Sequence, residues 1–432
     1  MSQSLSCRNG KLFDHHGTLC LSVPRMGFNA MKLNPEYRMF DANMFLQLHA
    51  TLEDIVAPTG MEMLDLSIGE PQISGGSLLT DSVAAHNRDW QFYPKVPGTS
   101  AFTDAVCGYI GRRWPAAAGL AKLRTQILPV PGTREPLALL GGLVRNTKPN
   151  AVALVTNPFY HAWRAGALAS GAEITFIDSH QSNDFIPDLA ALAPDILDRT
   201  TLMYLCSPTN PQGSVMDMSY LRHALSLARQ HDFLLIMDEC YTDIWRADRV
   251  PTGMLEAAAS LAEGDEDPLR NLVVVNSLSK RSSAAGLRAG FIIGDASVIT
   301  QYGKIVANGG SLVPTPLLAV AADLYADDSH VEAIRAHYDE SFAIAKRHLG
   351  IDPPPGGFFL WLEVGDDVAF VRQLMAEQGV RALPGQFMGA PGAGSSPAAG
   401  FVRLALVHDH SKIEDAMSRV ARLWQNDERK MV

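Results

Sequence analysis

Seven short apolar segments, separated by stretches with helical spacing, constrain the fold of this chain more than any other feature. Each is rich in Val, Ile and Leu and is bounded by turn residues. They cover residues 126–132, 151–158, 173–178, 201–208, 233–239, 272–277 and 289–294. Near-continuous apolar strands that alternate with helices are typical of a parallel sheet buried on both faces. We therefore predict an α/β fold with a mostly parallel sheet and helices on both faces.

The length of the chain predicts more than one domain. A chain of 432 residues is too long for one compact core. The alternating pattern changes after about residue 315, where long helical stretches precede two further strands. We predict a large domain over residues 81–315 and a smaller α+β domain over 316–432, to which residues 32–80 contribute. Residues 1–31 are polar and irregular, and we expect them to form a loose extension.

Composition argues against several classes of partner. The formal net charge is -10, and the basic residues are not gathered into runs, so we expect neither nucleic acid nor an anionic membrane surface as a partner. No segment approaches the roughly 18–20 apolar residues that span a bilayer, so no membrane segment is expected. The first 30 residues lack the continuous apolar stretch of a secretory signal.

Cysteine and histidine usage indicates a cytoplasmic protein without a metal. The five cysteines form no C-x-x-C pair, which disfavours a disulfide framework or a zinc site and fits a reducing cytoplasm. Cys206 and Cys240 end apolar runs and are expected to be buried packing residues. The thirteen histidines show no metal-binding spacing, and the pairs at 15–16 and 408–410 are interpreted as surface residues.

The stretch "VVVNSLSKRSSAAGLRAGFIIG" at 273–294 is the strongest chemical signal. An apolar strand is followed by serine, lysine and arginine residues, at a point where the backbone must turn closely around a bound group. Ser277, Ser279 and Arg288 are suitable donors to a phosphate. Lys280, flanked by Arg281 and by apolar sequence, could carry a lowered pKa and act as a nucleophilic amine. A solvated basic loop is the alternative interpretation.

Further polar residues follow the carboxyl ends of the predicted strands, where sites in open α/β sheets lie. In "PVPGTREPL" a strand turns into a helix, so backbone N–H groups and a threonine hydroxyl can receive an anion. "LCSPTNPQG" ends a second strand and "IMDECYTDI" a third. These segments supply Gly132, Thr133, Arg134, Asn210, Asp238 and Tyr241.

A phosphate cradle, a buried carboxylate, an amide, a phenol and one lysine together indicate pyridoxal 5′-phosphate. Lys280 can bond the cofactor's aldehyde, and Asp238 can hold its ring nitrogen protonated. Asn210 and Tyr241 would bond the 3-hydroxyl of the ring. Taken singly, Asp238 could be a helix N-cap, Asn210 a turn residue and Arg288 an ordinary surface arginine.

Over about residues 60–425 the sequence resembles the fold-type I pyridoxal-phosphate aminotransferases of class I/II. The matching segments are "SIGEP", "YPKVPGTSAF", "PGTRE", "NPFY", "SPTNPQG", "DECY", "SLSKRSSAAGLRAGF", "GGFFLWL" and "FVRLAL". The resemblance implies a homodimer with shared active sites, in which Tyr93 reaches the phosphate of the neighbouring subunit. It also implies that Tyr160 stacks on the ring, that Arg403 pairs with the substrate α-carboxylate and that Gly69 lies beside that carboxylate.

Other structural roles are open for these residues. Arg403 could form a cross-strand ion pair, and Tyr93 and Tyr160 could be ordinary aromatic packing residues.

Within the class, the segments are most similar to N-succinyldiaminopimelate aminotransferases of bacterial lysine biosynthesis. This implies a ping-pong transfer from glutamate to N-succinyl-2-amino-6-oxopimelate, with Lys280 moving the α-proton. Arg134, or a loop over 306–314 of the partner subunit, would hold the distal carboxylate. The alternatives are an aspartate- or aromatic-type aminotransferase, a pyridoxal-phosphate lyase or decarboxylase on the same fold, and a non-enzymatic binding domain of aminotransferase ancestry.

Overall fold

The computed structural model describes residues 6–8, 11–13, 19–20, 33–41, 43–120, 123–246, 249–262, 267–390 and 396–424. The chain forms two compact units, Met1–Ala42 and Asn43–Val432. The first contains an antiparallel sheet of β1 (Ser6–Arg8), β2 (Lys11–Phe13) and β3 (Leu19–Cys20), followed by a 3-10 helix, Pro35–Asp41. These strands are not among the predicted elements. The rest of 1–31, including the histidine pair at 15–16, lies outside the described residues.

The second unit is built on a seven-stranded sheet with the order β5-β11-β10-β9-β8-β6-β7. Its strands are β5 (Ile127–Val130), β6 (Val152–Asn157), β7 (Glu173–Asp178), β8 (Thr200–Cys206), β9 (Leu234–Asp238), β10 (Leu272–Ser277) and β11 (Gly290–Gly294). All lie within or next to the seven predicted segments. The sheet is parallel except for β11, which runs antiparallel to both of its neighbours. The predicted mostly parallel sheet is therefore confirmed.

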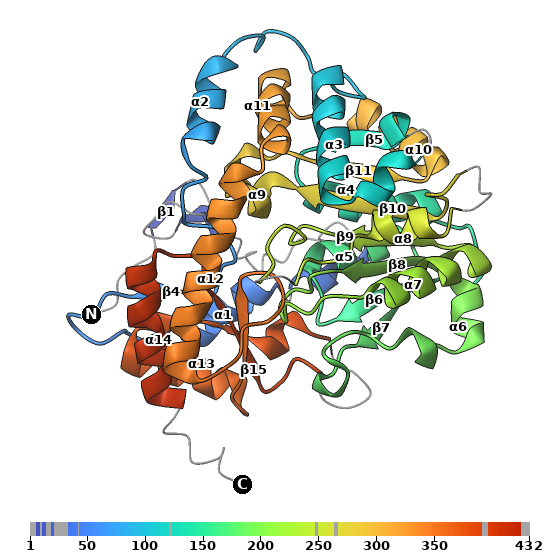
Figure 1. The fold of residues 1–432 in the computed structure, drawn as a ribbon. Coiled ribbons are helices and arrows are strands. Elements are labelled where there is room, and N and C mark those ends of the chain that lie inside the picture. The colour runs from blue at the N-terminus through green and yellow to red at the C-terminus, as the bar shows by residue number, and fades with distance from the viewer. Residues whose placement is uncertain are drawn as a thin grey trace. The chain divides into compact units, whose positions relative to one another are not determined.

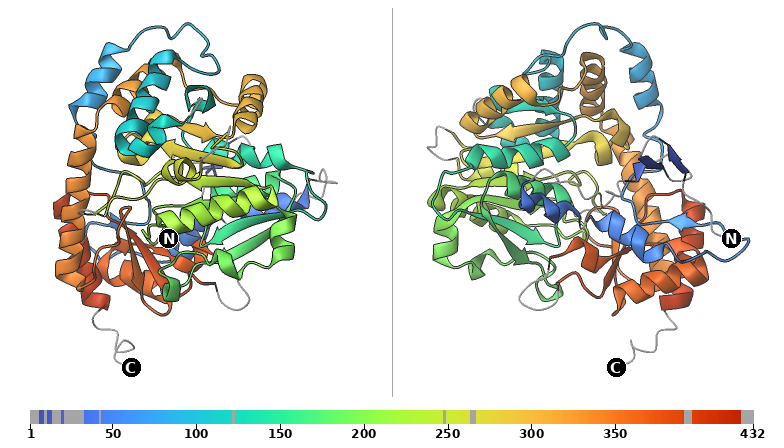
Figure 2. Two further views of the ribbon diagram at one scale, coloured as in Figure 1. Left: turned by 45° about the vertical axis from the view of Figure 1, so that its right-hand side comes forward. Right: turned by 180° about the vertical axis from the view of Figure 1, so that it is seen from behind.

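Helices cover both faces of this sheet. Successive residues of a strand point to opposite faces, and in this sheet both faces carry apolar side chains that the helices bury. In β9, Leu235 and Met237 belong to one apolar cluster and Leu234 and Ile236 to another. The first cluster includes residues of α3, α7, α8 and α11, and the second includes residues of α4, α5 and α10. Figure 2 shows the two sides of the sheet in its two views.

The helices of the second unit have the following bounds. The α-helices are α1 (Met44–Leu52), α2 (Ser77–Ala85), α3 (Ser100–Arg113), α4 (Arg134–Leu139), α5 (His161–Ala169), α6 (Pro194–Arg199), α7 (Met218–His231), α8 (Met254–Ser260), α9 (Leu278–Arg281), α10 (Ala296–Gly309), α11 (Thr315–Ala326), α12 (Ser329–Leu349), α13 (Asp367–Gln378) and α14 (His410–Trp424). Short 3-10 helices cover Pro115–Gly119, Leu123–Gln126, Leu140–Val144, Gln181–Asn183, Leu189–Ala191, Ala285–Leu287 and Gly385–Met388. Across the described ranges, no helix combines the length and apolar character needed to cross a membrane.

A separate core forms around a smaller sheet. Its antiparallel strands have the order β12 (Phe359–Glu363), β15 (Phe401–Ala405) and β14 (Leu383–Pro384). Next to it, β13 (Val380–Arg381) pairs in parallel with β4 (Leu64–Asp65). Side chains of α1, α13 and α14 complete this core. Residues before and after the large sheet thus share one core.

Helix α12 contributes to both cores (Figure 1). Ile334 and Tyr338 pack in a cluster of the large sheet, whereas Phe342 and Leu349 pack in the core of the smaller sheet. The preceding helix, α11, packs against α3, and its buried residues such as Leu324 belong to a core cluster of the large sheet. The predicted domain limits at residues 81 and 316 stay a prediction.

Candidate active site

One cavity of about 430 Å³ lies at the carboxyl ends of the large-sheet strands. Most of the predicted site residues line it: Gly69, Thr133, Arg134, Tyr160, Asn210, Asp238, Tyr241, Ser277, Ser279, Lys280, Arg288 and Arg403. Gly132 and Tyr93 are not among the lining residues. Gly132 lies next to the cavity, in contact with Arg288. Tyr93 is 94% exposed and contributes nothing to the site of its own chain.

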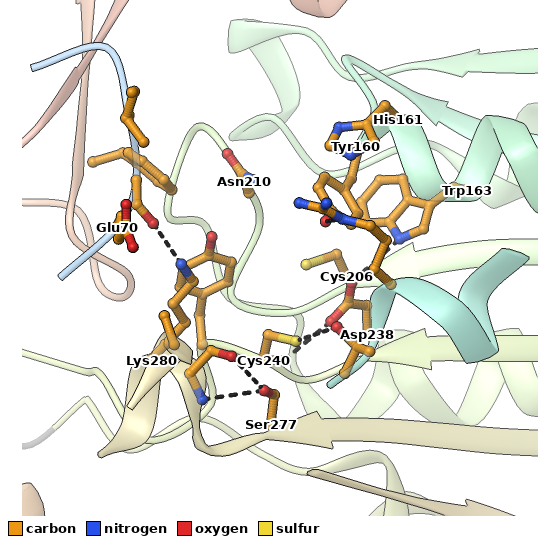
Figure 3. Close-up of a pocket in the computed structure, with 18 of the residues that line it drawn as sticks. Glu70, Tyr160, His161, Trp163, Cys206, Asn210, Asp238, Cys240, Ser277 and Lys280 are labelled. Carbon is orange, nitrogen blue, oxygen red and sulfur yellow. Dashed lines mark hydrogen bonds between the residues drawn. The ribbon is translucent and has the colours of Figure 1, made fainter. Parts of the chain in front are cut away.

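The turn that carries Lys280 begins where β10 ends. The backbone N–H of Ser279 donates to the Ser277 hydroxyl over 3.1 Å, so Ser277 caps the one-turn helix α9. Lys280 Nζ donates to the carbonyl of Gly69 (Figure 3) and lies 5.5 Å from the centre of the Phe358 ring. A Cβ at position 69 would lie 2.4 Å from the Phe359 ring, so only glycine fits between this ring and the Lys280 amine without a shift of the ring.

Lys280 is chemically activated by its surroundings. Burial lowers the pKa of its ammonium group to about 8, and the nearby cations Arg403 and Arg288 act in the same direction, while Cys240 and Glu70 oppose them. A substantial fraction of the amine is therefore neutral near pH 8, and a neutral amine can act as a nucleophile or as a base.

Hydroxyl groups and one guanidinium form an anion cradle at the end of the cavity next to β5 and β10. Ser277 Oγ donates to Ser279 Oγ over 2.9 Å, and Thr133 Oγ1 lies 3.2 Å from Cys240 Sγ. Arg288 donates to the carbonyls of Pro131 and Ala285, each over 3.0 Å. Gly132 has φ +75°, and a Cβ there would lie 2.6 Å from Arg288 Nη2, so only glycine fits the cradle.

Asp238, the last residue of β9, presents a buried carboxylate to the cavity (Figure 3). Its Oδ2 accepts a hydrogen bond of 3.2 Å from Trp163 Nε1, and its Oδ1 accepts one of 3.2 Å from the backbone N–H of Cys240. Burial raises the pKa of this carboxyl, and these hydrogen bonds and the charge of Lys280 oppose the rise. Among the described residues, no cation forms an ion pair with Asp238. The carboxylate is thus fixed in place with its negative charge unmatched.

Arg403 is a buried cation on β15. Its Nη1 donates to Asn210 Oδ1 over 3.1 Å and its Nη2 to the carbonyl of Ser67 over 2.8 Å, while its Nε has no partner. Burial lowers the pKa of the guanidinium to about 10. Its cross-strand neighbours are Trp361 and Leu383, so the alternative of a cross-strand ion pair is wrong. Within the described part of the chain, no carboxylate neutralises this cation.

Tyr160 and His161 line the side of the cavity away from Lys280 (Figure 3), and Arg134 also lines the cavity. Arg134 Nε donates to the Tyr160 hydroxyl over 3.2 Å, and the His161 ring lies 4.3 Å from the Tyr160 ring. Burial lowers the pKa of His161 to about 4, so its imidazole is neutral at pH 7. Its Nδ1 has no hydrogen-bond partner in the structure.

Sequence reasoning missed several lining residues. Trp163 lies one helical turn after Tyr160, and this spacing was the available signal for it. Glu70 and His161 directly follow predicted site residues. Cys206 is buried as predicted, but Cys206 and Cys240 also line the cavity, which was not predicted for either. They do so because Cys206 ends β8 and Cys240 lies two residues after the end of the neighbouring strand β9.

Comparison with known proteins identifies the family. The family described as "Aminotransferase class I and II" matches residues 61–420. A probable aminotransferase of Mycobacterium tuberculosis is 30% identical over 380 residues, which cover 86% of this chain and 84% of that protein. The chain belongs to the class I and II aminotransferases. A crystal structure of an aminotransferase from Neisseria meningitidis matches with a TM-score of 0.83 and 32% identity, covering 90% of this aminotransferase and 98% of that chain.

A third relative is named for a substrate. The LL-diaminopimelate aminotransferase of Syntrophobacter fumaroxidans is 26% identical to this aminotransferase over 405 residues, which cover 91% of this chain and 97% of that protein. Specific similarity to N-succinyldiaminopimelate aminotransferases is not among these findings.

Class I and II aminotransferases of this fold use pyridoxal 5′-phosphate. The cavity of this aminotransferase fits that cofactor. It combines an anion cradle that a side chain at Gly132 would obstruct, a fixed carboxylate that no cation of the described residues pairs with, and an amine with a lowered pKa. The described residues contain no group of three or more His, Cys, Asp or Glu side chains arranged to hold a metal ion.

Proposed function

We propose that this aminotransferase moves an amino group between glutamate and N-succinyl-2-amino-6-oxopimelate. The observation that carries this proposal is Arg403, a buried cation without a carboxylate partner among the described residues, which lines the same cavity as the Lys280 amine. A buried charge is costly unless it is paired, so the site favours a substrate that brings its own carboxylate. Amino acids and 2-oxo acids both supply one.

The bound cofactor supplies an electron sink for the reaction. The cavity would hold the phosphate of the cofactor with Thr133, Ser277, Ser279 and Arg288, while Gly132 leaves room for Arg288 and Arg134 lies at the edge of the cradle. Tyr160 would cover the ring, and Asp238 would accept a hydrogen bond from the protonated ring nitrogen. Asn210 and Tyr241 would bond the ring hydroxyl.

Arg403 and Lys280 act on the substrate itself. Arg403 binds the α-carboxylate, and Gly69 lies beside it, so that the Cα–H bond is held in one orientation. The Lys280 amine first acts as a base that takes the α-proton. It then acts as an acid that returns the proton to complete the transfer of the amino group. The second half of the ping-pong cycle repeats these steps in reverse on the oxo acid.

We further propose that the enzyme is a homodimer that completes each site with Tyr93 of the other subunit. Trp90, Phe92 and Tyr93 are exposed aromatic side chains on one loop, and no described residue covers Tyr93. We expect sedimentation velocity to give a dimer. Coexpressed Tyr93→Ala and Lys280→Ala chains should regain activity, because one site of each mixed dimer is intact. A monomer, or mixed dimers without activity, would contradict this proposal.

Recognition of the distal carboxylate provides the test of the acceptor. Arg134 is exposed in the cavity wall, bonded only to Tyr160 among the described contacts, and is free to meet a carboxylate. Hydrogen bonds to charged groups contribute roughly 1.5–3 kcal/mol. Removing the succinyl carboxylate from the acceptor should therefore lower kcat/KM by about 10- to 150-fold. In Arg134→Met, the acceptor with the succinyl carboxylate and the acceptor without it should react at similar rates, because the side chain proposed to bind that carboxylate is gone.

The experiment is a screen of amino donors and oxo acceptors with product mass spectrometry, followed by steady-state kinetics on the matched acceptor pair. Glutamate should remain a donor in Arg134→Met, because Arg403 is unchanged. Equal use of short apolar oxo acids by the wild-type enzyme would overturn the acceptor assignment and leave the amino transfer intact. Turnover of LL-diaminopimelate as a donor would instead favour the activity named for the Syntrophobacter fumaroxidans relative.

A further inference from the structure

The turn that carries Lys280 contacts a cluster of ion pairs, formed by Arg281 with Asp243 and Asp328, whose members do not line the cavity. Arg281, the next residue, has only 1% of its side chain exposed and is not among the lining residues. Arg281 and Lys280 therefore point to different sides of the one-turn helix α9. The solvated basic loop considered from the sequence is wrong for Arg281.

Arg281 binds the junction between α11 and α12. Its Nη1 donates to the carbonyl of Leu324 over 2.8 Å, and its Nη2 donates to the carboxylate of Asp328 and, over 3.3 Å, to the carbonyl of Asp327. The guanidinium also lies 5.6 Å from the centre of the Tyr325 ring. The Arg281 side chain therefore joins the end of α9 to three acceptors at the junction of α11 and α12: two backbone carbonyls and one carboxylate.

A second carboxylate, that of Asp243, anchors Arg281 to the turn that follows β9. Arg281 Nε lies 3.3 Å from Oδ2 of the buried Asp243, and that same oxygen accepts a hydrogen bond of 2.8 Å from the Tyr109 hydroxyl. Arg113 Nε lies 3.5 Å from the other carboxylate oxygen. Arg281 thus pairs with two carboxylates, Asp243 and Asp328, which it shares with Arg113 and Arg112.

The same junction contacts the residue after Arg281. His330 Nε2 lies 2.8 Å from Ser282 Oγ, and His330 Nδ1 lies 2.9 Å from Oδ1 of Asp327. The turn is therefore tied to the start of α12 at two successive residues. Helix α12 then runs from the neighbourhood of α9 to the core of the smaller sheet, where it packs beside α14 (Figure 1).

We infer that Arg281 is a positioning residue for Lys280. Helix α9 has four residues, and an isolated helical turn is unstable without tertiary contacts. Ser277 caps its first end, and Arg281 holds its last residue to the junction that leads into α12. Because α12 shares a core with the sheet that carries Arg403, this connection sets the Lys280 amine relative to the substrate-binding cation.

The test compares Arg281→Met with Arg281→Lys and with the control Arg112→Met. Arg112 binds the same Asp328 and the carbonyl of Tyr325, but its side chain is 42% exposed and does not contact α9 in the structure. Arg281→Met should lower kcat by roughly 10- to 100-fold, the scale expected when a reacting group is misplaced by about 1 Å. KM for the amino donor should change less than about threefold, because Arg403 is untouched.

Arg281→Lys should recover most of the activity, because a cation again pairs with Asp243 and Asp328, and Arg112→Met should stay close to wild type. A wild-type kcat in Arg281→Met, or an equal loss in Arg112→Met, overturns the inference. If Arg281→Met does not accumulate as folded protein, Asp328→Asn decides: a lowered kcat with retained KM supports the inference, and a wild-type kcat overturns it. The assay uses any donor and acceptor that the wild-type enzyme turns over, so it does not depend on the acceptor proposed above.

Discussion

Lys280→Ala is expected to lower kcat by at least about 10³-fold, because the variant loses both the nucleophilic amine and the acid–base group. The cradle around Arg288 and the carboxylate of Asp238 remain, so the variant should still bind pyridoxal 5′-phosphate without covalent attachment. The measurement combines steady-state kinetics with borohydride reduction and peptide mass spectrometry. Wild-type enzyme should carry the cofactor mass on the peptide that contains Lys280, and the variant should carry none.

A matched control for this variant is Lys346→Ala, at an exposed lysine that pairs with Asp352. It should keep wild-type activity and the cofactor mass on Lys280. Near-normal turnover in Lys280→Ala, or a cofactor mass on a different lysine of the wild-type enzyme, would show that another residue is the base.

The pKa of about 8 for Lys280 adds a pH dependence to the same prediction. Burial disfavours the ammonium form, so the neutral amine predominates above pH 8, whereas an ordinary lysine needs a pH above about 10.4. In the cofactor-free protein, the rate of covalent capture of pyridoxal phosphate should rise with pH and level off just above 8. A rate that continues to rise to pH 10 would mean that burial does not activate this amine.

The strands of the large sheet were predictable because burial on both faces leaves near-continuous apolar runs. The direction of β11 was not, since a central strand buried on both faces has the same composition whether it runs parallel or antiparallel. The strand-end rule located Asp238, Asn210 and Lys280 because it needs only the order of strands along the chain. It could not give the hydrogen bond between Asn210 and Arg403, which lie 193 residues apart.

Residues whose role depends on long-range contacts were the ones missed. Arg281 was interpreted only as a cation beside Lys280, because its carboxylate partners Asp243 and Asp328 come from distant parts of the chain. Trp163 has the pattern of any apolar helix residue, and only the fold brings its Nε1 to Asp238. Sequence patterns identify the groups that line the cavity more readily than the groups that hold them in place.

Asp238→Asn is expected to lower kcat by at least about 10²-fold while leaving the ligand-free protein as stable as wild type or slightly more stable. A neutral amide cannot match a positive charge on the ring nitrogen, so the electron sink is weakened. The folded state raises the pKa of Asp238, mainly through burial, so folding disfavours its charged form. Above the ordinary pKa of an aspartate, burying the charged Asp238 carboxylate therefore lowers the stability of the folded protein. Asparagine carries no charge, so Asp238→Asn removes this cost. The measurement is kcat together with the Tm of the cofactor-free protein.

The control is a carboxylate with the opposite role. Asp295 caps α10 and accepts hydrogen bonds from the backbone N–H groups of Ser297 and Asn271, over 2.8 and 2.9 Å. Asp295→Ala should lose about 1 kcal/mol of stability with kcat unchanged, because it removes an N-cap far from the reacting atoms. If Asp238→Asn instead lowers Tm and keeps kcat, Asp238 is a structural residue like Asp295. The two variants separate these roles because Asp295 accepts hydrogen bonds that cap a helix, whereas burial disfavours the charged form of Asp238.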